Sequence, residues 1–176
     1  MAKFKLMNSK TAKETLTTTT EIVLPNDTNA LGNLHGGKLM LWMDVVSAIS
    51  AHRLCKRVVV TASVNNISFR HGIKLGSIVT LEAKVSRTFN TSTEVVIDVL
   101  VEDRVTAEKK KHNEAIFTFV AVDQNGSPLP VPEVIPETEL EKQRFEGALR
   151  RRQLSLILAG KMKPDEATEL KALFVK

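Results

Sequence analysis

The sequence predicts an α+β protein in which an antiparallel sheet of about five strands wraps around one long central helix, followed by a C-terminal helical extension. Residues 37–57 form a nearly continuous apolar segment with no proline and no glycine after Gly37. Several later segments alternate between apolar and polar residues, as half-buried antiparallel strands do. Charged residues interrupt the segment at 37–57, so it lacks the roughly 20 apolar residues of a membrane span. The sheet is therefore expected to cover it.

The central helix is expected from Gly37 to Arg57. This segment is rich in leucine, methionine and alanine, which favour helix, and a helix of this length is roughly 30 Å long. Apolar residues occur on almost every side, so we expect burial all round. Asp44 stands in its middle, and an unpaired buried carboxylate is costly. Asp44 is therefore either a core residue satisfied by a neighbouring group or a functional residue.

Five strands are expected around the helix. They are residues 17–24, 58–69, 77–89, 93–102 and 113–123. The segments at 77–89 and 93–102 alternate regularly, whereas 113–123 is apolar on both faces and should lie inside the sheet. Asn65 and Asn66 suggest a bulge in the second strand, and lysines 109–111 suggest a solvated loop.

Composition divides the chain into three parts. Residues 1–15 are expected to be a flexible N-terminus, 16–127 the main folded domain, and 128–176 a proline-rich linker with C-terminal helices. The prolines at 128–136 prevent free pairing as an interior strand. Thr138 and Glu141 match a capping box that opens a charged helix to about Ala159.

Composition also limits the function. The net charge of +5 suits an anionic ligand, whereas 5% aromatic residues and no tyrosine argue against a nucleic-acid partner. Cys55 is the one cysteine of the sequence and reads as a core residue, so no intrachain disulfide or cysteine-based zinc site is possible. The scattered histidines predict no metal site. The N-terminus lacks the apolar region of a secretion signal, so we expect a cytoplasmic protein without membrane insertion.

Three motifs resemble the hotdog-fold acyl-CoA thioesterases, and among them the cytosolic long-chain acyl-CoA thioester hydrolases. The motifs are NALGNLHGG at 29–37, LWMD at 41–44 and VTASV at 60–64, in this order and spacing. The proline-rich ending also resembles the family's, and the similarity covers residues 17–152. It implies the hotdog fold and hydrolysis of fatty acyl-CoA to fatty acid and CoA, with no cofactor besides the coenzyme A of the substrate.

The resemblance also implies a catalytic pair. In the family, an asparagine in the glycine-rich turn and an acidic residue on the central helix carry catalysis, and these fall on Asn33 and Asp44. Because this single-domain chain has both residues, the resemblance implies a homo-oligomer with equivalent sites. The expected assembly is a dimer joined side by side into one sheet, built further into a hexamer. Asn33 of one subunit would then face the partner subunit's Asp44.

The chemistry follows from these residue types. Asp44 would activate water as a general base or attack the thioester to form an anhydride, and the sequence does not separate the two. Asn33 would orient the water or hold the thioester oxygen, unless it is only a left-handed turn residue. The N–H groups of Gly36 and Gly37 are candidates for the oxyanion hole, because donors at a helix start are unpaired and the dipole favours negative charge. The same glycines would also suit tight packing of the turn.

Coenzyme A is a polyanion with an extended pantetheine arm, and the resemblance suggests two contact regions. They are Thr61, Ala62, Ser63 and Val64, whose backbone would bind the arm, and Arg87, Thr91 and Ser92, which would bind phosphate. The run Arg150–Arg152 either reaches phosphate as well or forms a solvated helix face.

Two other functions stay open. A non-catalytic acyl-CoA-binding protein on the same fold would need no pair of Asn33 and Asp44. A dehydratase acting on acyl carrier protein would need a catalytic histidine, for which His35 is the candidate, although His35 also suits a turn-positioning or packing role. No GxSxG motif is present, so a serine triad of that kind is not predicted.

Overall fold

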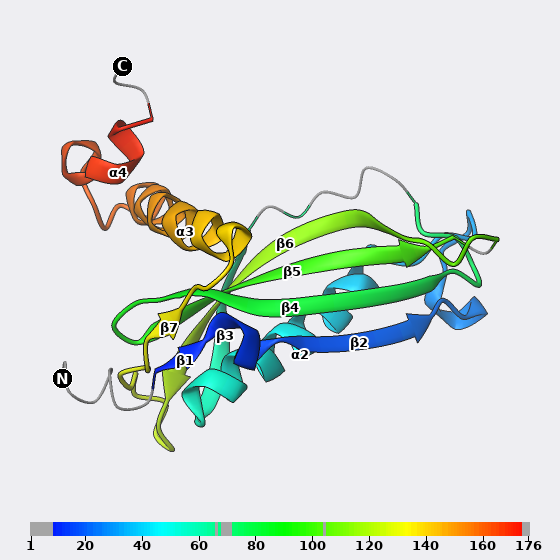
Figure 1. Ribbon diagram of the computed structural model, residues 1–176, viewed down its shortest axis with the longest axis horizontal. Helices are drawn as coiled ribbons and strands as arrows, with labels where there is room; N and C mark the ends of the chain where they lie inside the picture. The colour runs from blue at the N-terminus through cyan, green and yellow to red at the C-terminus, as the bar shows by residue number, and fades with distance from the viewer. Residues whose placement is uncertain (1–8, 66, 68–71, 104, 174–176) are drawn as a thin grey trace. The chain divides into compact units, whose positions relative to one another are not determined.

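A computed structural model describes residues 9–65, 67, 72–103 and 105–173 of the chain. The chain divides into two units, Met1–Ile135 and Pro136–Lys176. In the first unit a five-stranded sheet curls around one long helix, α2 (Figure 1). The strand order is β2-β4-β5-β6-β3, and every pair of neighbours is antiparallel. The α+β prediction is therefore confirmed.

The main elements of the first unit fall close to their predicted positions. They are β2 (Thr17–Ile22), α2 (Gly36–Cys55), β3 (Val58–Asn65), β4 (Ile78–Thr88), β5 (Ser92–Glu102) and β6 (Lys109–Val122). As predicted, β6 lies inside the sheet, between β5 and β3. The predicted loop at lysines 109–111 is wrong, because these residues open β6. Lys111 is held there by ion pairs with Asp98 at 2.7 Å and Glu114 at 2.5 Å.

The bulge in β3 lies closer to the strand's start than predicted. The register against β6 shifts between Thr61 and Ser63, which makes Ala62 the extra residue. The predicted position at Asn65 and Asn66 is therefore wrong for Asn65, which is regularly paired, and Asn66 lies outside the described residues. A bulge increases the local twist and redirects neighbouring side chains, here next to Thr61.

The N-terminal region is more ordered than the sequence suggested. Strand β1 (Lys10–Thr11) pairs in parallel with β7 (Val134–Ile135), and the 3-10 helix η1 (Ala12–Thr15) follows it. The expected flexibility is thus wrong for residues 9–15, and residues 1–8 lie outside the described part. Because β7 lies within the proline-rich segment, that segment belongs to the first unit up to Ile135. Lys10 Nζ donates to the carbonyl of Arg53 at 2.6 Å.

The core lies between the concave face of the sheet and one side of α2. It contains Val79, Leu81, Ala83 and Val85 of β4, Val95, Ile97 and Val99 of β5, Phe117 and Phe119 of β6, and Leu39, Met43, Val46 and Leu54 of α2. The strand residues alternate in sequence because every second side chain of a strand points to the same face.

The other side of α2 is not covered in the single chain. Leu41, Val45 and Ile49 are 56%, 49% and 42% exposed and follow one another at four-residue intervals, so they form one apolar stripe. The prediction of a helix buried all round is therefore wrong for the isolated subunit. Strand β3 is an edge of the sheet, and its Val58 and Val60 are exposed as well. We call Leu41, Val45 and Ile49 the apolar stripe.

The second unit is helical. Helix α3 (Glu139–Leu158) begins with the predicted capping box, in which Thr138 Oγ1 accepts the N–H of Glu141 at 3.2 Å. A 3-10 helix, η3 (Pro164–Glu166), and a short helix, α4 (Thr168–Lys171), follow. The N–H of Leu170 donates to Gln153 Oε1 at 2.9 Å and ties α4 to α3. Within the described residues, no helix combines the length and apolar character that crossing a bilayer requires.

The start of α2 is fixed by Asp27, which ends the 3-10 helix η2 (Pro25–Asp27). Its carboxylate pairs with Lys38 Nζ at 3.0 Å and accepts the N–H of Leu24 at 3.2 Å. Its carbonyl accepts the N–H of His35 at 2.8 Å. The hydrogen bond from Lys38 is the main reason that the pKa of Asp27 lies below its usual value.

We expect Asp27→Asn to destabilise the protein near neutral pH, because it removes the charge that Lys38 stabilises. A lowered pKa in the folded state contributes stability above the unfolded pKa of about 3.9, and this contribution is lost as the pH falls through the folded value. The difference in unfolding free energy between the two proteins should therefore shrink below about pH 4. Urea unfolding across pH measures it. Equal stability of the two proteins at pH 7 would contradict the role of Asp27.

Candidate active site

A carboxylate–hydroxyl pair joins α2 to the edge of the sheet. Thr61 Oγ1 of β3 donates a hydrogen bond to Asp44 Oδ1 at 2.7 Å. Thr61 is exposed and Asp44 is half-buried, so the carboxylate lies at the surface of the single chain. Asp44 is therefore satisfied by a neighbouring hydroxyl, as one of the two interpretations supposed, but it lies at the surface and not in the core. Its place beside the apolar stripe explains why it interrupts an apolar sequence.

The glycine-rich turn before α2 is held by its own side chains. Asn29 Oδ1 accepts the N–H groups of Leu31 at 2.9 Å and Asn33 at 3.2 Å. The backbone also links the turn to the segment that precedes β4, because the N–H of Leu34 donates to the carbonyl of Ile73 at 2.7 Å. These bonds hold the backbone of the turn that carries Asn33.

A cavity of about 340 Å³ lies between this turn, the start of α2 and β6. It is lined by Asn29, Asn33, Leu34, Gly36, Leu39, Gly72, Ile73, His112 and Asn113, and we call it the amide cavity. Asn33 Oδ1 is buried and has no hydrogen-bond partner among the described residues. A Cβ atom on Gly72 would lie 2.5 Å from this oxygen, so the missing side chain of Gly72 makes room for the amide.

The two glycines at the start of α2 differ in their surroundings. Gly36 is the first residue of the helix and borders the amide cavity. Gly37 is exposed, and a Cβ there would meet nothing within 4 Å, so tight packing does not explain it. The side chain of His35, the N-cap residue, makes no capping bond to the first helical N–H groups.

The single chain does not bring all the predicted residues together. Asp44 and Thr61 are not among the residues that line the amide cavity. Along β3, Ala62 is exposed, and Ser63 and Val64 are half-buried, so this edge is accessible in the single chain.

The predicted phosphate-binding turn lies elsewhere in the sheet. Thr61 pairs with Phe119 of β6, which pairs with Thr93 of β5, and two strand spacings amount to roughly 10 Å. Arg87 stacks over Phe89 with 5.9 Å between the guanidinium carbon and the ring centre, and Thr91 is half-buried. Ser92 is 7% exposed, so its hydroxyl is poorly placed for a ligand in the single chain.

Three polar residues of the amide cavity were not predicted from the sequence: Asn29, His112 and Asn113. His112 Nδ1 and Asn113 Oδ1 are in hydrogen-bond contact. Asn113 pairs with Val99 of β5, whose side chain faces the core, so an asparagine there breaks the apolar pattern of the inner face. That break was the available signal for Asn113. Nothing in the sequence pattern pointed to His112.

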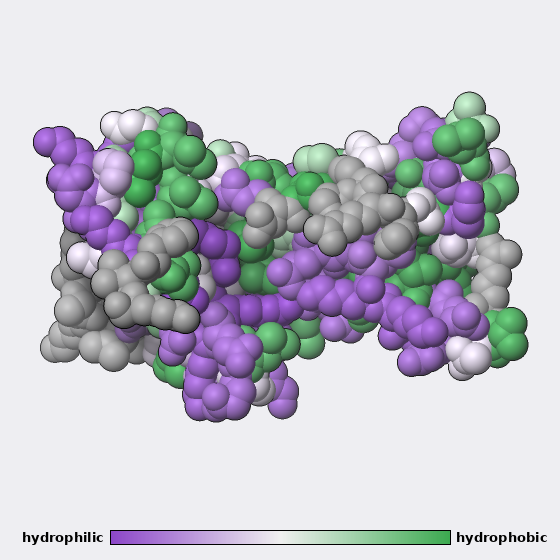
Figure 2. Space-filling model, turned by 90° about the horizontal axis from the view of Figure 1, so that it is seen from above, coloured by the Kyte–Doolittle hydropathy of each residue, from purple (hydrophilic) through white to green (hydrophobic). Residues whose placement is uncertain are grey.

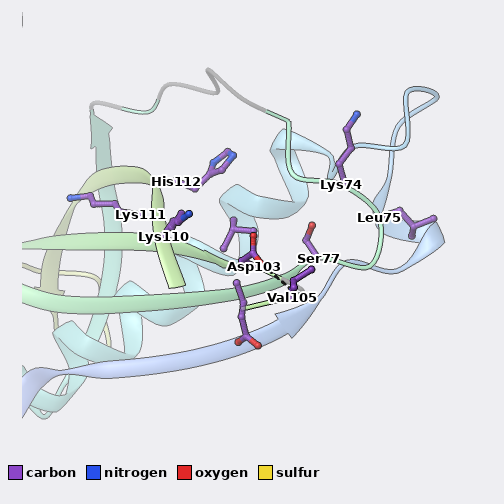
Figure 3. A pocket seen from close by; sticks show the side chains of 10 residues that line it. Lys74, Leu75, Ser77, Asp103, Val105, Lys110, Lys111 and His112 are labelled. Atoms are coloured by element: carbon purple, nitrogen blue, oxygen red, sulfur yellow. Dashed lines mark hydrogen bonds between the residues drawn. The ribbon is translucent and has the colours of Figure 1, made fainter. Parts of the chain in front are cut away.

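A second hollow, of about 580 Å³, shares His112 with the amide cavity (Figure 3). It is lined by Lys74, Leu75, Ser77, Val101, Glu102, Asp103, Val105, Lys110, Lys111 and His112, which carry both signs of charge. Leu75 and Val105, which line this hollow, are exposed. Figure 2 shows hydrophobic and hydrophilic patches lying side by side on the visible face. None of the predicted site residues lines this hollow.

Cys55 has no catalytic character. The side chain is buried, its Sγ lies 3.5 Å from Thr93 Oγ1, and burial raises the pKa of the thiol. A nucleophilic cysteine needs the opposite shift, since the thiolate is the reactive form. Among the described residues, no group of three histidine, cysteine or acidic side chains could hold a metal ion.

We expect Cys55 of the folded protein to react slowly with 5,5′-dithiobis(2-nitrobenzoic acid) at pH 7.5, because burial limits access and disfavours the thiolate. Unfolding in urea should make the single thiol react within the mixing time of a conventional assay. Absorbance at 412 nm follows both reactions. Rapid labelling of the folded protein would contradict the described burial.

Comparison with known proteins places the chain in a family. Residues 31–108 match the family model described as the thioesterase superfamily. The chain is 41% identical over 139 residues to a Bacillus subtilis protein named as an uncharacterized acyl-CoA thioester hydrolase, covering 79% of this chain and 81% of that protein. The chain belongs to the thioesterase superfamily. The sheet wrapped around α2 is the hotdog fold of this superfamily, as the resemblance implied.

A longer relative of the thioesterase superfamily is the rat cytosolic acyl coenzyme A thioester hydrolase. It is 42% identical over 127 residues, which are 71% of this chain and 33% of that protein. Among solved structures, an apo-hexameric acyl-CoA thioesterase superposes with a TM-score of 0.82 at 37% identity, covering 86% of this chain and 97% of that one.

An acyl-CoA hydrolase from Staphylococcus aureus, solved with butyryl coenzyme A and coenzyme A, superposes with a TM-score of 0.81 at 33% identity, covering 87% of this chain and 95% of that one. Variants of that hydrolase with an aspartate, an asparagine or a threonine replaced by alanine have also been solved. In that protein the aspartate lies 15 positions after the asparagine, and the threonine lies 17 positions after the aspartate.

Proposed function

We propose that the protein hydrolyses acyl-CoA thioesters to free fatty acids and coenzyme A. The observation that carries this proposal is the outward-facing pair of Asp44 and Thr61, joined at 2.7 Å. Thr61 lies 17 positions after Asp44, which is the spacing of the substituted aspartate and threonine in the S. aureus hydrolase. The names of the relatives support the same reaction.

In the proposed reaction Asp44 acts on a water molecule beside the thioester carbonyl. The water attacks the carbonyl carbon while its proton passes to the carboxylate, and the resulting intermediate expels the thiolate, which recovers the proton. Direct attack by the carboxylate to form an anhydride is the alternative. Thr61 would hold one carboxylate oxygen in place, which leaves the other to face the water.

The asparagine partner has two candidates in the same turn. The resemblance assigns catalysis to Asn33, which lies 11 positions before Asp44. The spacing of 15 positions in the S. aureus hydrolase instead matches Asn29. Both asparagines line the amide cavity, and each can supply an acceptor and two donors. The spacing favours Asn29 as the partner that orients the water or the thioester oxygen.

The donors for the developing oxyanion are the N–H groups of Gly36 and Gly37. These groups begin α2, where backbone donors have no intrahelical partner and the helix dipole favours negative charge. Gly36 borders the amide cavity, so an oxygen held there would lie beside the turn asparagines.

The site is proposed to form between subunits. Asp44 and the amide cavity are separate in the single chain, and the apolar stripe together with the open edge of β3 is suited to a second copy. Pairing two β3 edges would continue the sheet and remove an exposed edge. The hexameric state named for a solved relative supports assembly beyond the dimer.

In such a dimer the backbone of Thr61–Val64 would bind the pantetheine arm. Arg87, Thr91 and Ser92, from another part of the assembly, would contact the phosphate groups of coenzyme A. The cytosolic name of the rat relative supports a cytoplasmic location.

A dehydratase role for His35 has no support, because that residue is exposed at the N-cap and does not line the amide cavity. A non-catalytic acyl-CoA-binding protein would not need the hydrogen-bonded pair of Asp44 and Thr61.

We expect Asp44→Ala to lower kcat for palmitoyl-CoA by at least about two decades while binding is retained, because the base or nucleophile is lost. Thr61→Val should lower kcat by roughly tenfold, about the worth of one hydrogen bond to a charged group, and Thr61→Ser should restore it. Steady-state release of CoA measures all three, with Asp165→Asn as a surface control. Near-normal turnover by Asp44→Ala would reject the proposed reaction.

Mixed oligomers test the shared site. We expect the combination of Asp44→Ala subunits with Asn29→Ala subunits to regain activity, since half of the sites in a mixed dimer would carry both intact residues. The same mixture made with Asn33→Ala compares the two asparagines. Co-expression with two affinity tags isolates the mixed species before the assay. Purified mixed oligomers that stay inactive in both combinations would place the whole site within one subunit.

A further inference from the structure

A short hairpin at residues 27–35, which we call the asparagine hairpin, carries both asparagines of the candidate site. The N–H of Asn29 donates to the carbonyl of Asn33 at 2.8 Å, and the N–H of His35 donates to the carbonyl of Asp27 at 2.8 Å. Helix α2 begins at the next residue. The hairpin therefore leads directly into the two N–H groups that are proposed to bind the developing oxyanion.

The first turn of α2 is weakly constrained by its own sequence. It opens with Gly36 and Gly37, and glycine has more backbone freedom than any other residue. The first buried residue of the helix is Leu39, so packing against the sheet holds the helix from that point on. The asparagine hairpin is held separately, because the N–H of Leu75 donates to the carbonyl of Gly32 at 3.0 Å. Alignment of the hairpin with the first turn thus depends on contacts that cross the two glycines.

Asp27 makes such contacts on both sides of the glycines. Its carbonyl accepts the N–H of His35, and its carboxylate pairs with Lys38 Nζ at 3.0 Å. The Asp27 side chain is 11% exposed, and Lys38 Nζ also lies 5.7 Å from the ring centre of Trp42. Exposed ion pairs contribute little because both side chains stay mobile. Here the carboxylate is mostly buried, and the aromatic ring limits the movement of the ammonium group.

Asp27 does not take part in the chemistry itself. It does not line the amide cavity, and its carboxylate is occupied by Lys38 and by the N–H of Leu24. The hydrogen bond from Lys38 lowers the pKa of the Asp27 carboxyl group, which makes this carboxylate a weaker base at neutral pH. Any effect of Asp27 on the reaction must therefore come through the groups that it holds.

We propose that Asp27 is a positioning residue, whose ion pair with Lys38 holds the N–H groups of Gly36 and Gly37 in line with the amides of the asparagine hairpin. The inference rests on the proposed hydrolysis of acyl-CoA thioesters. Loss of the pair leaves every reacting group in the protein but lets the first turn of α2 move relative to the hairpin. Such misplacement slows the chemical step more than it weakens binding of the substrate.

The first test removes either partner of the ion pair. Asp27→Asn and Lys38→Met should each lower kcat for palmitoyl-CoA roughly tenfold, which is less than the about two to three decades that follow loss of an oxyanion donor. KM should stay within about twofold, because the groups that bind the substrate are unchanged. The double variant should be no slower than the slower single variant, since both changes remove one contact. Lys38→Arg keeps the pair and should keep kcat within about twofold of the wild-type value.

A second test separates positioning from a general loss of stability. It uses Asn29→Ala or Asn33→Ala, whichever has the lower kcat, as the background for Asp27→Asn. Once the amide that matters is absent, its alignment with α2 has no further effect, so Asp27→Asn should then lower kcat by less than about twofold. A substitution that only destabilised the fold would lower kcat by the same factor in both backgrounds, and that outcome would overturn the proposal.

Two control variants match these changes. Glu139→Gln removes another ion pair between an acid and a lysine, in which Lys142 Nζ lies 2.8 Å from Glu139 at the start of α3. Ile97→Val lowers stability through the core, since Ile97 is fully buried. Both variants should keep the kcat of the wild-type protein. Circular dichroism and urea unfolding establish that every variant is folded under the assay conditions.

The outcomes separate this inference from the proposed function. If Asp44→Ala abolishes hydrolysis of palmitoyl-CoA but Asp27→Asn and Lys38→Met keep the wild-type kcat, the positioning role is wrong and the hydrolase stands. If the effects of Asp27→Asn and Lys38→Met multiply in the double variant, the two residues act independently and the positioning pair is again wrong. If the wild-type protein hydrolyses neither palmitoyl-CoA nor butyryl-CoA, the proposed function itself fails.

Discussion

A five-stranded sheet covers only one side of a helix, and the remainder of the architecture depends on this constraint. The inner faces of β4, β5 and β6 bury one side of α2, whereas Leu41, Val45 and Ile49 stay exposed in the single chain. The exposed side lies next to β3, an open edge of the sheet. An apolar helix face beside an unpaired strand edge is typical of a surface that associates with another one. The proposed active site lies along the same boundary.

The location of Asp44 follows from that constraint. A carboxylate that faced the core would destabilise the folded protein. A carboxylate that faced bulk water would not hold a substrate or a reacting water in a fixed position. At the margin of the apolar stripe, Asp44 is half-buried and receives a hydrogen bond from Thr61. Closure by a second subunit would lower the local dielectric around the carboxylate without sealing it from a substrate. Lower polarity strengthens every electrostatic interaction in such a site.

The sequence predicted the fold well because its signals are local. The helix at α2 and the alternation in β4 and β5 are visible within short windows, and the capping box at Thr138 is read from four residues. Signals that depend on distant contacts were missed. The pairing of β1 with β7 joins the two ends of the first unit, and the ordering of lysines 109–111 depends on carboxylates in β5 and β6.

The site was predicted in part for the same reason. Asp44 was visible as a charge in an apolar helix, but the hydroxyl of Thr61 and the cavity formed by Asn33 and Gly72 depend on packing between segments. Asn113 lies on the core-facing side of β6, a strand whose sequence is otherwise mostly apolar. No sequence pattern marks His112 as a site residue. The resemblance directed attention to Asn33 and left out Asn29, whose visible contribution in the single chain is to hold the turn.

The pairing of β1 with β7 has a consequence for how the chain is made. Lys10 leaves the ribosome early, but its partner Val134 emerges only after the sheet and α2 have been synthesised. The N-terminal residues must therefore wait for a late segment before they can dock, and a long loop closes at that moment, which slows folding. Lys10 also donates to the carbonyl of Arg53 in the last turn of α2, so the late docking of β1 adds a hydrogen bond to a helix end that the Lys56 N–H and the His52 side chain already hold.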